Sequence, residues 1–271
     1  MTGAWAVEHG MVVRRSGDAS APSIVWIHGL GEWSVSFDAI TRHPRLAAFA
    51  HVLVDMPGYG RTPASIVHDT VQAHADHLAR WLADRPPAIL VGHSMGGVIA
   101  TLVAERSPVR AVVNVDGNLT LGDCTFSARA AGYSLDDFRA HGFAQMRAAI
   151  YARGATEPAL AGYHAAMVAA HADTLWANAK DLVRISTAGD LAPRFAALSC
   201  PHLFIAGVPR GICAESRARL DAVGARWIGI EPAGHWPFID QSDAFAAAVA
   251  EFLVAVWTVG SVAWLLTTKR G

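Results

Sequence analysis

One pentapeptide, Gly92-His93-Ser94-Met95-Gly96, constrains the fold of this chain more than any other stretch. It directly follows a short apolar run and opens an Ala/Val/Leu-rich helical pattern. A Gly-x-Ser-x-Gly between a buried strand and a helix predicts a nucleophile elbow, a turn so sharp that its serine has strained backbone angles. Gly92 and Gly96 lack the Cβ atoms that would clash there. Ser94 then lies at a helix N-terminus, where free N–H groups favour negative charge. The alternative is a glycine-rich turn with an incidental serine.

Strand and helix patterns alternate on both sides of this motif. The helical patterns include an amphipathic one over 65–85 and one over 37–49 that Pro44 interrupts. Continuous apolar runs alternating with helices predict a mostly parallel sheet that is covered by helices on both faces. The predicted strands are 4–7, 11–15, 23–27, 51–54, 89–91, 109–115, 202–206 and 226–230.

The alternation fails in one region, 118–182, where only helical patterns occur and aromatic residues are frequent. We interpret it as a helical cap inserted over the carboxyl edge of the sheet. The prediction is an α/β core of residues 1–117 and 183–253, a cap of residues 118–182 and an apolar C-terminal extension of residues 254–271.

Composition narrows the class of protein. A chain of 271 residues is long enough for one large α/β domain with an insertion. A net charge of -1, with 17% charged residues, argues against a nucleic-acid partner. Three cysteines without a C-x-x-C pattern are typical of free thiols in a reducing compartment. Residues 1–10 show no signal-peptide pattern, so we expect a cytoplasmic protein.

The C-terminal stretch is unusually apolar, because Glu251 is its only charge between residues 244 and 268. That length could span a bilayer. Phe245, Val249 and Leu253, however, form the core-facing stripe of a final helix, and the uncharged part beyond it is short for a span. We expect a packed helix with an apolar extension; membrane or partner contact is the alternative.

Three further motifs accompany the elbow, each in a loop after a predicted strand: His28-Gly29, the Asp-x-Pro-Gly-x-Gly of residues 55–60, and the Gly-His-Trp-Pro of residues 234–237. In this order they resemble the α/β-hydrolase superfamily over roughly residues 5–253. The resemblance implies the α/β-hydrolase fold with an inserted cap. It also implies a Ser–His–acid triad and an oxyanion hole at the carboxyl edge of the sheet.

Ser94 and His235 match the nucleophile and the base of that triad. A hydroxyl needs an adjacent base to become nucleophilic, and imidazole titrates near neutral pH. His28 and His93 are the nearest competitors for the base, but each flanks a glycine in a tight loop and is expected to hydrogen-bond locally. The His74/His77 pair could suggest a metal. A solvated helix face is the favoured interpretation, and we expect no metal or organic cofactor.

The acid departs from the family's commonest pattern. The usual loop, 207–213, holds no carboxylate before Glu215. Asp116 ends the strand after the elbow helix, and some members of the superfamily carry the acid there. We therefore predict Asp116 as the residue that orients His235; otherwise it caps a turn. Asp55 and Asp190 are weaker candidates.

The oxyanion hole would use the backbone N–H groups of Leu30 and Met95. Trp33, Trp176 and Trp236 suggest a largely apolar substrate pocket, although core packing explains cap aromatics equally well.

A serine nucleophile, in place of an aspartate, argues against dehalogenase and epoxide hydrolase chemistry. The prediction is a hydrolase of an ester, thioester or lactone with a modest-sized apolar acyl group. The alternatives are a carbon–carbon hydrolase of vinylogous diketones, a metal-free haloperoxidase-like activity with the same triad, and a non-catalytic ligand-binding protein on the same fold. In each case the expected partner is a small molecule.

Overall fold

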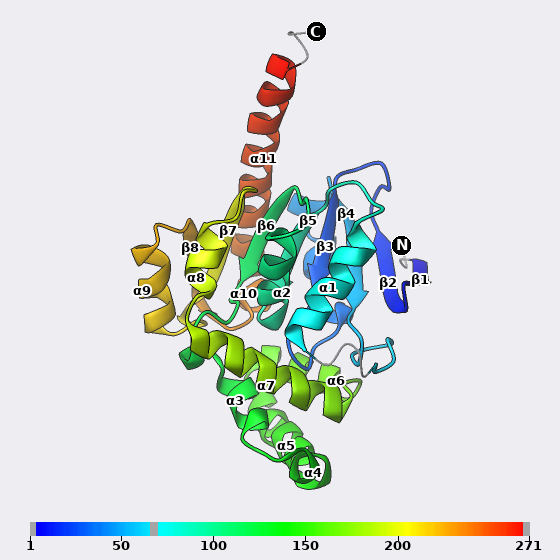
Figure 1. Cartoon of the computed structure of the whole chain (residues 1–271), viewed down its shortest axis with the longest axis vertical. Coiled ribbons are helices and arrows are strands. Elements are labelled where there is room, and N and C mark those ends of the chain that lie inside the picture. Colours follow the sequence, from blue (N-terminus) through cyan, green and yellow to red (C-terminus); the bar gives the residue numbers. More distant parts are fainter. Residues whose placement is uncertain (1–3, 66–69, 268–271) are drawn as a thin grey trace.

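The computed structural model describes residues 4–65 and 70–267. Within these ranges the chain forms an eight-stranded sheet in the order β1-β2-β4-β3-β5-β6-β7-β8 (Figure 1). β1 and β2 form an antiparallel hairpin, β2 is antiparallel to β4, and each pairing from β4 through to β8 is parallel. The predicted mostly parallel sheet is thus confirmed. Its strands are β1 (Ala4–Glu8), β2 (Met11–Ser16), β3 (Ser23–Ile27), β4 (Ala50–Asp55), β5 (Ile89–His93), β6 (Ala111–Val115), β7 (His202–Arg210) and β8 (Trp227–Gly234).

Helices cover both faces of this sheet. α1 (Val71–Leu82), α2 (Met95–Ala104) and α8 (Leu191–Ala196) lie in front of it in Figure 1, and α10 (Pro237–Asp240) and the start of α11 (Ser242–Thr267) lie behind. α9 (Ala214–Ala222) lies beside the β8 edge. Every residue of α2 is buried, because this helix packs directly on the central strands. α1 is amphipathic instead, and Thr70 caps it by accepting the N–H of Ala73 at 3.0 Å.

The predicted helical insertion is present beyond the carboxyl ends of the strands, in the lower part of Figure 1. Pro158 begins α6, where its missing N–H costs nothing, and Gly189 ends α7 in a left-handed conformation. The boundary predicted between residues 182 and 183 falls inside α7, so the division into core and cap stays a prediction. The insertion contains α3 (Thr125–Ala131), α4 (Leu135–Asp137), the π-helical turn η6 (Phe138–Gly142), α5 (Phe143–Gly154), α6 (Pro158–Met167) and α7 (Ala172–Ala188).

Residues 37–49 do not form the interrupted helix that their pattern predicted. They belong to a run of short 3-10 turns, η1 (Ser34–Phe37), η2 (Ile40–Arg42) and η3 (Pro44–Leu46). Pro44 offers no N–H to a preceding turn, and the residue before it has extended backbone angles (φ −66°, ψ 132°). The chain therefore cannot continue one helix through this point.

The His74/His77 pair does not lie on a solvated helix face, as the sequence suggested. Both side chains are buried, and His74 Nε2 lies 2.8 Å from Asn178 Oδ1 of α7. The helix turns this face toward the insertion, which the sequence pattern of α1 alone does not show. Among residues 4–65 and 70–267, no group of three metal-ligating side chains is found.

The final helix, α11, is continuous from Ser242 to Thr267 and leaves the body of the molecule (Figure 1). Phe245, Val249 and Leu253 are buried, as their spacing predicted. The predicted extension thus continues the same helix up to residue 267, and its last four residues lie outside the described range. No helix within residues 4–65 and 70–267 has both the length and the hydropathy of a membrane span.

Candidate active site

Ser94 lies between β5 and α2 with backbone angles φ 54° and ψ −120°, which non-glycine residues rarely adopt. The glycines on either side make this turn possible. A Cβ on Gly92 would lie 2.1 Å from the carbonyl oxygen of Gly96, and a Cβ on Gly96 would lie 2.1 Å from that of Ile27. Strand and helix can therefore approach closely only with glycine at both positions, and the serine is held at the helix N-terminus.

Asp116 follows β6 and its side chain is fully buried. Its Oδ2 lies 3.1 Å from Nδ1 of His235, while its Oδ1 accepts the N–H groups of Gly207 at 3.0 Å and Ile212 at 3.2 Å. Burial raises the pKa of this carboxyl, and the hydrogen bonds from His235 and the N–H of Gly207 act in the opposite direction.

The loop after β7, in which the sequence lacks an acid, is shaped to receive the Asp116 carboxylate. A Cβ on Gly211 would lie 2.3 Å from Asp116 Oδ2. The loop thus leaves space at this position, and the carboxylate receives one N–H from Ile212 of the loop and one from Gly207 near the end of β7. An acid carried by β6 thereby reaches the base beyond β8.

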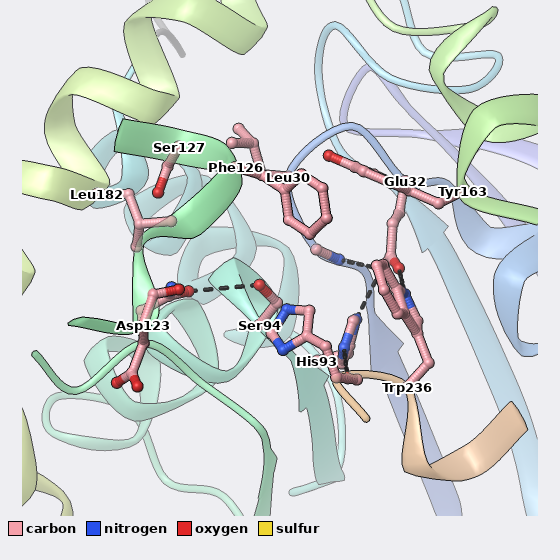
Figure 2. A pocket seen from close by; sticks show the side chains of 13 residues that line it. Leu30, Glu32, His93, Ser94, Asp123, Phe126, Ser127, Tyr163, Leu182 and Trp236 are labelled. Atoms are coloured by element: carbon pink, nitrogen blue, oxygen red, sulfur yellow. Dashed lines mark hydrogen bonds and ion pairs between the residues drawn. The ribbon is translucent and has the colours of Figure 1, made fainter. Parts of the chain in front are cut away.

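The Ser94 hydroxyl donates to Oδ1 of Asn118 at 3.3 Å (Figure 2). Asn118 is oriented in turn by its own amide group, which donates to the carbonyl oxygen of Asp123 at 3.0 Å. Sequence reasoning missed Asn118, although its place two residues after Asp116 at the end of β6 put it at the same edge of the sheet.

The two predicted oxyanion donors lie at the expected places in the backbone. Leu30 lines the cavity above Ser94, in a turn closed by the hydrogen bond from Glu32 N–H to Gly29 O at 3.2 Å. Met95 begins α2, where an N–H has no acceptor within the helix. Their role in oxyanion binding stays a prediction.

The cavity at Ser94 measures about 20 Å³, which is room for about one water molecule. Figure 2 shows Phe126 and Tyr163 of the insertion and Trp236 of the core around it. A larger ligand therefore needs more room than this cavity offers between the core and the insertion. The lining residues are Gly29, Leu30, Glu32, His93, Ser94, Asn118, Asp123, Phe126, Ser127, Tyr163, Leu182, His235 and Trp236.

Of the three tryptophans predicted to bind substrate, Trp236 is the one among these lining residues. Trp33 is half-buried, with the guanidinium of Arg61 5.8 Å from its ring centroid. Trp176 donates its indole N–H to the carbonyl oxygen of Tyr133 at 2.9 Å and so is anchored within the insertion. An aromatic residue next to a motif, or in a cap, satisfies local packing first, and this decides where the ring points.

The weaker candidates have structural partners. His28 is buried with Nδ1 2.8 Å from the carbonyl oxygen of Gly29, and its Nε2 accepts the N–H of Met56 at 3.0 Å. Asp55 accepts the backbone N–H of Arg61 in the loop that follows it and that of Ser34 at the start of η1. Asp190 precedes α8 and pairs with Arg194, and Glu215 pairs with Arg219 one turn further along α9. None of these side chains lines the cavity at Ser94.

A second buried acid–imidazole pair lies next to the first, and sequence reasoning missed it. Glu32 Oε2 lies 2.9 Å from Nδ1 of His93 and accepts the N–H of Gly29 at 2.7 Å. Its Oε1 accepts the indole N–H of Trp236, and His93 Nε2 lies 2.7 Å from the carbonyl oxygen of His235. The only signal was a carboxylate three residues after Gly29.

Comparison with known proteins places the chain in a family. The model of the alpha/beta hydrolase family matches residues 24–248, so the chain belongs to this family. It is 31% identical over 254 residues to the pimeloyl-[acyl-carrier protein] methyl ester esterase of Edwardsiella ictaluri, covering 86% of this chain and 94% of the relative. It is 26% identical to the 2-succinyl-6-hydroxy-2,4-cyclohexadiene-1-carboxylate synthase of Serratia proteamaculans, covering 89% and 97%.

Solved structures share the fold. The enol-lactonase of Burkholderia xenovorans superposes with a TM-score of 0.72 at 23% identity, over 93% of this chain and all (100%) of the other. A thermophilic esterase of Thermogutta terrifontis superposes with a TM-score of 0.73 at 20% identity, over 91% and 94%. The chain is therefore an alpha/beta hydrolase in fold and family, with esterases and lactonases among the proteins it is similar to.

Proposed function

We propose that this chain is a serine hydrolase that cleaves an ester, thioester or lactone of a modest-sized apolar acyl group through an acyl-enzyme. The observation that carries the proposal is the 3.1 Å contact of buried Asp116 with His235, a residue that lines the same cavity as Ser94 on its strained turn. A buried carboxylate on Nδ1 leaves Nε2 of the same ring as the nitrogen that can exchange a proton with a substrate or nucleophile.

In this mechanism Ser94 attacks the carbonyl carbon while His235 accepts its proton. The backbone N–H groups of Leu30 and Met95 are the proposed donors to the oxyanion, since Leu30 lines the cavity and Met95 is the first residue of the helix after Ser94. His235 then returns the proton to the leaving group, and a water molecule hydrolyses the acyl-enzyme by the same route in reverse.

In this structure the Ser94 hydroxyl donates its hydrogen bond to Oδ1 of Asn118, 3.3 Å away. Its O–H must therefore turn from Asn118 toward His235 before it reacts. Catalytic hydrogen bonds are often loose in a free enzyme and tighten with substrate. Asn118 thus holds the hydroxyl until a substrate displaces it.

The lining of the cavity supports a small apolar acyl group. Leu30, Phe126, Leu182 and Trp236 supply apolar surface on several sides of Ser94. The similar proteins named above include a methyl ester esterase and an enol-lactonase, in agreement with acyl transfer to water.

The test is labelling of the purified protein with a fluorophosphonate probe, read out by intact mass. We expect one adduct on the wild type and none on Ser94→Ala. A panel of p-nitrophenyl esters of two to eight carbons, a thioester and a lactone then identifies the bond. A folded wild type that takes no adduct would overturn the proposal and favour the ligand-binding alternative. A labelled protein that cleaves a vinylogous diketone and no ester would favour the carbon–carbon hydrolase.

A further inference from the structure

Glu32 and His93 form an ion pair that is shut off from solvent, with side chains 2% and 1% exposed. Burying two charges is costly, and apolar residues of similar volume are often as stable or more so. A pair of this kind at an active site therefore calls for a reason other than stability.

The hydrogen-bond geometry defines the charge of His93. Its Nδ1 faces a carboxylate oxygen of Glu32 at 2.9 Å, and its Nε2 faces the carbonyl oxygen of His235 at 2.7 Å. The carbonyl oxygen has no proton to offer. Burial opposes ionisation of Glu32, but His93 and the hydrogen bonds from Trp236 and Gly29 lower its pKa to about 2, so its carboxylate oxygen is also an acceptor. Both ring nitrogens must then donate, which only the imidazolium form can do.

The same two side chains connect three separate loops. Glu32 accepts the N–H of Gly29, next to the predicted oxyanion donor, and the indole N–H of Trp236. His93 directly precedes Ser94 and donates to the backbone of His235. The pair therefore links the oxyanion loop, the nucleophile turn and the loop of the base, as Figure 2 shows for Glu32, His93 and Trp236.

We propose that Glu32 and a permanently charged His93 are positioning residues that hold His235 and the oxyanion loop in register with Ser94. This role rests on the proposed serine hydrolase function. The ion pair acts through the backbone of His235 and through Gly29, and it touches no reacting atom. Small displacements of a base or of an oxyanion donor are expensive, since an error of 1 Å costs about 100-fold in rate.

The surroundings of His93 agree with a charged ring. The ring of His235 lies 4.8 Å away between centroids, and Trp236 and Phe238 enclose the remaining sides at 5.8 and 5.1 Å. Burial lowers the pKa of His93, but Glu32 more than compensates and raises it overall, with smaller contributions from the carbonyl oxygen of His235 and from Asp116. Burial lowers the pKa of the neighbouring His28, and the charge on His93 acts in the same direction.

The first experiment reads the charge directly and needs no substrate. In protein labelled with 15N-histidine, we expect one histidine to keep both ring nitrogens protonated at pH 8, and this signal to disappear in Glu32→Gln. A wild type in which all histidines are neutral at pH 8 would overturn the charge assignment, whatever the enzyme turns out to hydrolyse.

The second experiment reads positioning. Glu32→Gln should lower kcat about 10- to 100-fold with little change in KM, and should slow fluorophosphonate labelling of Ser94 by a similar factor. The control for loss of stability is Leu220→Ala, which creates a cavity under α9. Leu220 is buried but does not line the cavity at Ser94, so this variant should keep kcat near the wild-type value.

Glu32→Asp keeps the charge and shortens the side chain, so it should recover part of the loss in kcat. If Glu32→Gln does not fold, Glu32→Asp takes its place as the test variant. Equal kcat in the Glu32 variants and in Leu220→Ala would contradict the positioning role. Failure of the wild type itself to label would instead contradict the proposed function, and the 15N result would still stand.

Discussion

Two acid–imidazole pairs lie side by side at the carboxyl edge of this sheet, and only one is suited to proton transfer. In both, a buried carboxylate meets Nδ1, at 3.1 Å for Asp116 with His235 and at 2.9 Å for Glu32 with His93. His93 is 1% exposed and has an acceptor on each nitrogen. The side chain of His235 is 19% exposed, and within the described residues its ring is hydrogen-bonded through Nδ1 alone.

The difference shows that residue type and pairing do not by themselves make a base. An imidazole can accept a proton only if one nitrogen has a free lone pair that a reactant can reach. In His93 both ring nitrogens donate hydrogen bonds. The ring can therefore carry a positive charge and position the groups it contacts, but it has no free lone pair with which to accept a proton from a reactant. Three variants test this contrast, in order of expected effect.

The largest effect is expected for Asp116→Asn. It removes the charge beside Nδ1 of His235, so under the proposed triad kcat should fall about 10³- to 10⁴-fold while the protein still folds. The measurement is turnover of the best p-nitrophenyl ester, with circular dichroism as the folding check. Wild-type turnover in this variant would contradict a catalytic role for Asp116 and leave it as a residue that caps a turn. A fall no larger than that of Glu32→Gln would remove the distinction between the two pairs.

Gly211→Ala tests whether the loop after β7 must leave room for the acid. The new Cβ would lie 2.3 Å from Asp116 Oδ2, so the carboxylate has to shift and kcat should fall by about 10-fold or more. Gly162→Ala is the matched control, because a Cβ there meets nothing within 4 Å. Within α6 it should raise the free energy of unfolding by about 0.5–1 kcal/mol and leave kcat unchanged. Equal activity of both variants would show that the acid does not depend on this space.

The smallest effect concerns acid stability. Burial opposes ionisation of Glu32, but His93 and the hydrogen bonds to the carboxylate lower its pKa from 4.5 to about 2. Because the folded pKa is the lower one, the ionised carboxylate contributes stability above pH 4.5, and this is lost as the pH falls toward 2.

The difference in free energy of unfolding between wild type and Glu32→Gln should therefore shrink from pH 5 to pH 2. Urea unfolding at pH 5, 4, 3 and 2 measures it. A difference that does not change with pH would contradict a charged Glu32.

The sequence by itself determined the order of strands and helices, the insertion and the nucleophile turn. Strands buried on both faces read as continuous apolar runs, and Gly92 and Gly96 are required by contacts with their immediate surroundings. Such signals are local and survive in a single sequence. The break in the helical pattern at Pro44 is also a local signal. The sequence showed the break but not that the residues around it form 3-10 turns.

The sequence predicted the pairing of Asp116 with His235, but only the tertiary structure brought Glu32 to His93 and Trp236. Asp116 and His235 are 119 residues apart, and Glu32 and Trp236 are 204 residues apart. The direction in which Trp33 and Trp176 point, the burial of His74 and the size of the cavity were likewise decided by packing between distant elements. A hydrogen bond to a distant residue depends on side-chain direction and on what else occupies the space, and neither is encoded in spacing along the chain.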